Sequence, residues 1–160
     1  MRLLKLSVSA ALVLISASIS VAAAGCGGEM GSDACTASGR ADSYVVGLAH
    51  KGVNTVYDFK LMSATPAPPG LNLNTWVIQI NWEATGAPAT GASLTVSPFM
   101  PDQQQGPGTY TPQVQELSTP GQYQISNINT WMPGYWEITI DAKTSGNVED
   151  TAVYKFCISA

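Results

Sequence analysis

The chain has few charged side chains, a single histidine and only three cysteines, and each scarcity argues against a class of function. Charged residues make up 11% of the 160 positions, with seven lysines and arginines against eleven acidic residues. Nucleic-acid binding needs clustered basic side chains that neutralise phosphates, whereas the basic residues beyond the N-terminus occur singly. The composition therefore argues against a nucleic-acid partner and against an anionic membrane surface.

Enzymatic chemistry finds little support in the residues that are present. His50, the one histidine, supports neither a histidine-rich metal site nor a catalytic triad without a recognisable nucleophile and orienting acid. The cysteines lack the CxxC spacing of redox and zinc motifs, and no strand-to-helix glycine loop could hold a phosphate. Asp102 with Glu116, and Glu149 with Asp150, lie in no framework typical of a glycosidase or an aspartic protease. We therefore expect a protein that is not an enzyme.

The first 25 residues predict a signal peptide. Arg2 and Lys5 supply a short positive region, residues 12–21 an apolar run softened by serine, and residues 22–25 a small-residue approach to a cleavage site. The apolar run is too short and too rich in serine to favour a permanent membrane span, although an uncleaved anchor stays open as an alternative. Cleavage would leave five basic against eleven acidic side chains in an exported chain.

Cys26 is the expected site of lipid attachment. The small-residue tract before it resembles a bacterial lipobox, apart from Ala23 where leucine is usual, and ordinary cleavage after Ala24 is the rival interpretation. Gly27 rather than aspartate follows the cysteine, which resembles an outer-membrane sorting signal. These features imply an extracytoplasmic lipoprotein that faces the periplasm or the cell surface and meets the membrane only through its lipid. The Gly, Ser and Ala residues of 26–42 predict a flexible stem.

Assigning Cys26 to a lipid leaves an even pair of cysteines, Cys35 and Cys157. We predict that these two form a disulfide, because exported proteins fold in an oxidising compartment. Such a bond would close a loop over most of the chain, for which the chain-entropy model gives at most about 4–5 kcal/mol. Two free thiols are the alternative.

From residue 43 onward, short β-forming runs alternate with proline, glycine and asparagine, and no window shows a helical period. The clearest strand is 75–82, in which Trp76, Ile78, Ile80 and Trp82 share one face. Further strands are expected at residues 54–62, 92–98, 110–116, 122–128, 135–142 and 151–158.

The alternation in these strands also predicts the core. Seven or eight strands at this spacing indicate one domain over residues 43–160, an immunoglobulin-like β-sandwich, with a small closed barrel as the alternative. Cys157 has the opposite parity to the inward side chains, so its disulfide should lie outside the sheet. The other side chains expected inside are Tyr57, Phe59, Leu61, Trp136, Ile138, Ile140, Tyr154 and Phe156.

Three consecutive segments between Asn74 and Ala142 carry a family resemblance: NTWVIQINW, GASLTVSPFMPDQQQGPGTYTPQV and GQYQISNINTWMPGYWEITIDA. Their order resembles the YtkA-like and FixH-like family of bacterial extracytoplasmic domains, in which a histidine-rich Met-Pro loop precedes a Met-Pro-Gly turn and a Trp-Glu strand. The resemblance implies a link to copper handling or respiratory oxidase maturation. Here glutamines 103–105 occupy the loop instead of histidines, and a neutral amide oxygen is a poor ligand for Cu(I).

Sulfur is the remaining candidate ligand for copper. Met100 and Met132 both lie in Met-Pro turns at predicted strand ends, and converging ends would let this thioether pair form a low-coordinate Cu(I) site with His50 or Met62. The alternative is that a methionine beside Trp131 fills a gap in the core. For His50 the simpler interpretation is an exposed loop histidine.

Trp131 and Tyr135 flank the turn at residues 132–134 and are the aromatic side chains expected to be exposed. With Gln103 and Gln105 they form the candidate surface for a protein partner in the cell envelope. The sequence thus favours a lipid-anchored envelope binding module without enzymatic activity. A structural or adhesive envelope domain, and a carbohydrate-binding module that stacks sugars on the two aromatic rings, are the alternatives.

Overall fold

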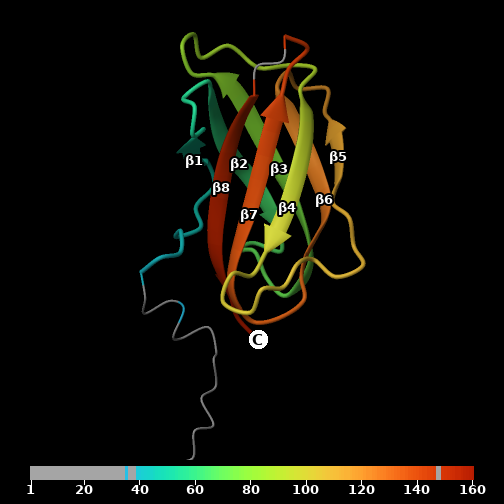
Figure 1. Cartoon of the computed structure of the whole chain (residues 1–160). Helices are drawn as coiled ribbons and strands as arrows, with labels where there is room; N and C mark the ends of the chain where they lie inside the picture. The colour runs from blue at the N-terminus through green and yellow to red at the C-terminus, as the bar shows by residue number, and fades with distance from the viewer. Residues whose placement is uncertain (1–34, 36–38, 147–148) are drawn as a thin grey trace, which may run out of the picture.

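The computed structural model of the chain describes residues 35, 39–146 and 149–160. Within these ranges the regular elements are eight β-strands, which confirms the all-β prediction (Figure 1). The strands are β1 (Leu48–Lys51), β2 (Tyr57–Thr65), β3 (Asn72–Trp82), β4 (Ser93–Phe99), β5 (Gln113–Glu116), β6 (Gln122–Thr130), β7 (Gly134–Lys143) and β8 (Glu149–Ile158).

The described strands form two antiparallel sheets that pack face to face. One sheet has the order β1-β2-β3-β6-β5, and the other has the order β4-β7-β8. Figure 1 shows the second sheet in front of the first. This arrangement confirms the predicted β-sandwich, and the barrel alternative is not realised in the part of the chain that the structure describes.

The core lies between the sheets and is built from the alternating side chains that the sequence pattern marks. Trp76 of β3 and Trp136 of β7 are both buried, as predicted. Each fully buried large apolar side chain contributes roughly 1.5–3 kcal/mol relative to exposure, so these rows dominate the stability of the domain. Trp82 differs from the prediction, since it lies half-buried at the end of β3 with its ring centroid 4.8 Å from that of Tyr57.

The Met-Pro loop after β4 and the Met-Pro-Gly turn before β7 lie at the same end of the sandwich. β4, β6 and β8 end there, while β3 and β7 begin there, at the lower end of the molecule in Figure 1. The connecting segments at this end are residues 66–71, 100–112 and 131–133. We call this region the loop end.

The segment before β1 runs along the free edge of β8. The backbone N–H of Asp42 donates to the carbonyl of Lys155 at 2.7 Å, and the N–H of Lys155 donates to Asp42 Oδ2 at 2.8 Å. We call residues 39–44 the arm. We expected residues 39–42 to be flexible stem, but Asp42 is bonded to β8 and Arg40 contacts Asp102 and Tyr135, so the fixed part of the chain begins before residue 43.

The predicted disulfide is present and joins Cys35 to Cys157, with the two Cα atoms 5.8 Å apart. Cys157 is half-buried between the buried Phe156 and Ile158, which confirms that its side chain points away from the core. The signal peptide, Cys26 and most of the predicted stem lie outside the described residues. Among the residues that are described, no helix is long and apolar enough to cross a membrane.

Candidate functional site

The glutamine loop, residues 100–105, is a tight turn with a fixed backbone. The N–H of Met100 donates to the carbonyl of Gln105 at 2.7 Å, and the N–H of Gln105 donates back at 3.2 Å. Gln104 adopts a left-handed conformation with φ of 54°, and its Nε2 donates to the carbonyl of Pro101 at 2.8 Å. The turn thereby holds the side chains of Gln103 and Gln105 in solvent on a defined framework.

Trp131 follows β6 and is 41% exposed, which agrees with the exposure that the sequence predicts. Its indole Nε1 donates to the carbonyl of Gly106 at 3.0 Å, and Asn129 Nδ2 donates to the carbonyl of Pro107 at 2.9 Å. These two bonds attach the segment after the glutamine loop to the end of β6. The indole is therefore held in one orientation while much of its surface remains in solvent.

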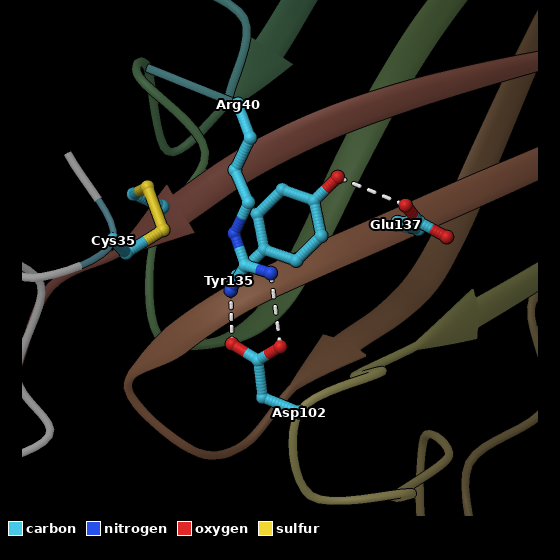
Figure 2. Close-up of a disulfide and its surroundings, with 6 residues drawn as sticks. Cys35, Arg40, Asp102, Tyr135 and Glu137 are labelled. Atoms are coloured by element: carbon cyan, nitrogen blue, oxygen red, sulfur yellow. Dashed lines mark hydrogen bonds and ion pairs between the residues drawn. A yellow bond between two sulfur atoms is a disulfide. The ribbon is translucent and has the colours of Figure 1, made fainter. Parts of the chain in front are cut away.

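Tyr135 differs from the prediction, because it is only 4% exposed. The guanidinium carbon of Arg40, in the arm, lies 3.9 Å from the centre of the Tyr135 ring and covers it (Figure 2). The phenol donates to Glu137 Oε1 at 2.8 Å. Burial, aided by the bond to this carboxylate, raises the pKa of Tyr135 to about 12. The prediction that Tyr135 is an exposed part of the candidate contact surface is therefore wrong.

Arg40 also connects the arm to the glutamine loop. Its Nη1 donates to Asp102 Oδ1 at 3.0 Å, and its Nη2 donates to the other carboxylate oxygen, the paired geometry that suits a guanidinium (Figure 2). Both side chains are exposed, so the ion pair alone contributes little to stability. Arg40 instead fixes the relative positions of its neighbours, because its side chain contacts both Tyr135 and the turn that carries Gln103.

Met100 and the turn at residues 132–134 do converge, as their predicted places at strand ends suggest. Met100 is 2% exposed, and its terminal methyl lies where a side chain at position 134 would begin. The methionine therefore occupies the space that the glycine leaves open, which is the behaviour of a core side chain. Met132 is half-buried against the core, and its carbonyl accepts a bond from Trp136 Nε1 at 2.8 Å.

His50 does not join the two methionines. It lies in β1, half-buried rather than in an exposed loop, with Nε2 3.1 Å from Asp42 Oδ2 and its ring 4.8 Å from that of Tyr154. Tyr154 pairs with Ile138, which is about 13 Å along β7 from Gly134 at the usual rise of a strand. The prediction that Met100, Met132 and His50 come together as a three-ligand site is therefore wrong.

The residues present do not fit a bound copper ion. Met100 is packed in the core, and the imidazole faces the Asp42 carboxylate at a distance from either thioether. Across the described residues, no group of three or more histidine, cysteine, aspartate or glutamate side chains could hold a metal ion.

Asn74, near the start of β3, holds the segment before β3 in place at the loop end. The sequence pattern did not mark it as a candidate site residue. Its buried Nδ2 donates to the carbonyls of Gly70 and Asn72 at 2.8 and 2.9 Å, and its Oδ1 accepts from the N–H of Gly70 at 2.9 Å. Thr130 Oγ1 donates to the same Gly70 carbonyl at 2.6 Å. The sequence could have indicated this role, because Asn74 shares the inward parity of Trp76 in β3. A buried side-chain amide needs hydrogen-bond partners.

Together these features define a small antiparallel β-sandwich with a braced cluster of loops at one end. The model of the YtkA-like family matches residues 52–141 of this sequence. The match covers more than half of the chain, so the protein belongs to the YtkA-like family, as the sequence resemblance indicates. The arm and β8 lie outside the matched residues. Comparison with curated proteins and with solved structures gives no match.

Proposed function

We propose that the protein is a binding module of the cell envelope, without enzymatic activity, that contacts a protein partner through its loop end. The observation that supports this proposal is that Trp131, a large aromatic side chain, is exposed and yet held in place by a hydrogen bond to the Gly106 carbonyl. Tryptophan is enriched among the residues that dominate binding energy at interfaces. A side chain already fixed in the free protein loses less conformational freedom on binding.

The neighbours of Trp131 support the same use. Leu73 is exposed and pairs across the sheet with Asn129, close to the tryptophan in sequence, while Gln103 and Gln105 lie on the fixed turn. We call Leu73, Gln103, Gln105 and Trp131 the loop-end surface. It combines two apolar side chains with two neutral amides that can both donate and accept hydrogen bonds, a composition suited to a protein surface.

The predicted lipid on Cys26 would place this surface near a membrane. Cys35 is fixed to β8 through Cys157, which pairs with Tyr135 at the loop end. The segment from Cys26 to Cys35 can span at most about 30 Å when fully extended. A lipid-anchored chain would therefore hold its loop end within about that distance of the bilayer, which favours a membrane-bound partner.

Site-specific photo-crosslinking in the producing cells tests this proposal. A photoreactive amino acid at Gln103 should give one discrete adduct, and the same residue at Ala87, exposed at the opposite end, should give none. Adding Trp131→Ala should reduce the Gln103 adduct at least five-fold. Adducts of equal yield from both ends, or none from Gln103, would instead favour a structural or adhesive envelope domain.

The carbohydrate-binding alternative is weakened because Arg40 covers one of its two aromatic rings, leaving Trp131 without Tyr135 beside it as a stacking platform. Titration of a glycan panel followed by tryptophan fluorescence tests it directly. We expect an unchanged spectrum. Copper handling and oxidase maturation remain a family-level association, to which the described side chains add no copper site.

A further inference from the structure

A groove lies beside the loop end, between the arm, the proline-rich segment before β3 and the end of β8. Its volume is about 450 Å³. Tyr44, Pro68, Pro69 and Phe156 are among the lining residues, so part of the lining is apolar. Cys157 also lines the groove, which brings the disulfide to its wall.

The two cysteines of the disulfide differ in accessibility. Cys35 is 6% exposed, whereas Cys157 is half-buried and faces the groove. Cys157 lines the groove and Cys35 does not, so a nucleophile that enters the groove approaches the disulfide from the side of Cys157. Attack at that atom makes Cys35 the leaving group, because thiol–disulfide exchange expels the sulfur that is not attacked.

A cation lies close to this bond. Tyr135 is the direct cross-strand partner of Cys157, so their Cβ atoms are about 5 Å apart, and the Arg40 guanidinium covers the Tyr135 ring. Figure 2 shows the disulfide and Arg40 in this arrangement. The guanidinium is paired with Asp102, and the Glu137 carboxylate accepts the Tyr135 phenol, so the charge around the disulfide is mixed and does not decide which sulfur is attacked.

We propose that the Cys35–Cys157 disulfide is a thiol–disulfide exchange site, at which a cysteine of a protein dithiol attacks Cys157 Sγ from the groove. The attacking thiolate forms a bond to Cys157 Sγ, and the Cys35 thiolate leaves and takes a proton from water. The second thiol of the dithiol then gives up its proton and attacks its neighbour, releasing Cys157 as a thiolate. The dithiol is oxidised to a disulfide, and this chain is reduced to two thiols.

Reduction would alter how the arm is held. With the disulfide open, the arm keeps the contacts of Arg40 and Asp42, and the exposed ion pair among them is weak. The first fixed point of the chain would move from Cys35 to Arg40, which adds about 17 Å to the reach of a lipid tether at full extension, or to Asp42 when the Arg40 contacts open, which adds about 25 Å. This consequence rests on the proposed membrane anchoring, whereas the exchange reaction itself does not.

Glutathione can serve as the probe thiol. The full chain carrying Cys26→Ser, in which Cys35 and Cys157 are the remaining cysteines, is incubated with reduced glutathione, quenched with an alkylating reagent and mapped by mass spectrometry. We expect glutathione on Cys157 at a yield at least five-fold above that on Cys35. A preference for Cys35, or equal labelling of both, would overturn the assignment.

The groove is tested by filling it. Ser43→Trp adds an indole at an exposed position of the groove wall, and Ser118→Trp adds the same side chain at an exposed position near the opposite end. We expect the first change to slow mixed-disulfide formation at least ten-fold and the second to leave it unchanged. If neither variant slows the reaction, or both slow it equally, the groove is not the route of attack.

A third variant separates attack on the folded protein from attack on an unfolded population. Ile140→Val removes a methyl group from the core of β7 and should raise the unfolding equilibrium constant several-fold. The rate of glutathione attack should stay the same if the folded protein reacts. A rate that rises in step with the unfolding constant, measured in urea on the same variant, would overturn the proposal.

Discussion

The guanidinium of Arg40 covers the ring of Tyr135, with 3.9 Å between the guanidinium carbon and the ring centre. The contact joins the arm to β7, and the same guanidinium bonds to Asp102 of the glutamine loop. One exposed side chain therefore links the N-terminal segment, the sheet and the loop-end surface. This relationship explains why an aromatic residue beside an exposed turn is buried.

Arg40→Ala should lower the pKa of Tyr135 from about 12 towards the ordinary tyrosine value. Burial is the largest cause of the raised pKa, and removal of the guanidinium opens the ring to water, which outweighs the loss of a nearby positive charge. The pKa is measured by NMR titration of the labelled Tyr135 ring. Lys143→Ala, at the other end of β7, is the control and should leave it unchanged. A pKa that stays near 12 in Arg40→Ala would contradict the role of Arg40 as a cover.

Asp150 should make the domain less stable in acid. Its buried carboxylate accepts the backbone N–H groups of Asn54, Val56, Tyr57 and Thr151. Burial alone opposes ionisation, but these bonds outweigh it and hold the pKa of Asp150 below its usual value. Because the folded pKa is lowered, the stabilisation is fully present above the unfolded value of about 3.9 and is lost as pH falls through the folded pKa.

Asp150→Asn tests this dependence. We expect a loss of about 2–3 kcal/mol at pH 7, since an amide cannot accept as strongly and brings its own N–H groups against four donors. Urea unfolding between pH 7 and pH 3 should show a shallower decline in the variant than in the parent. Asp141→Asn, an exposed neighbour on β7, is the matched control and should change stability by less than about 1 kcal/mol. Identical pH profiles for Asp150→Asn and the parent would contradict the argument.

The fold follows from local pattern wherever a strand has one buried face. The two-residue period over Trp76, Ile78 and Ile80 predicts β3 and its inward side chains, because only alternate positions of a strand can face the other sheet. The same parity marks Asn74 and Asp150 as inward. Polar side chains near strand ends are usually solvated, but these two are buried, and their hydrogen bonds go to backbone groups that the pattern does not reveal.

The candidate site was harder to predict because its contacts join distant parts of the chain. The burial of Tyr135 depends on Arg40, which the sequence places in a glycine-rich stem with no strand pattern. The position of His50 depends on how β1 pairs with β2, and its register sets it beside Asp42 and away from Met100. Trp131, by contrast, could be located because it follows a strand and precedes a turn signal.

Copper binding should be weak, because His50 lies far from Met100 and Met132, and Met100 is packed in the core. Titration of the reduced protein with Cu(I) against a competing chelator should show no site tighter than about micromolar affinity, or about −8 kcal/mol. The double variant Met100→Leu and Met132→Leu should behave as the parent does. Tight binding that this double variant abolishes would show that the thioethers form a site, in contradiction to the packing of Met100 against Gly134.

Asn74→Ala should destabilise the domain by about 2–4 kcal/mol, because it leaves the Gly70 N–H and the Asn72 carbonyl without their buried partner and removes packing volume. Asn81→Ala, in the same strand, loses one bond from Gln79 and should cost about 1 kcal/mol. Both values come from urea unfolding. Because Asn74 fixes the start of β3 against Thr130, next to Trp131, the variant should also broaden the Trp131 indole resonance in NMR spectra, and Asn81→Ala should not. Equal losses of stability in the two variants would mean that the network at Asn74 does not brace the loop end.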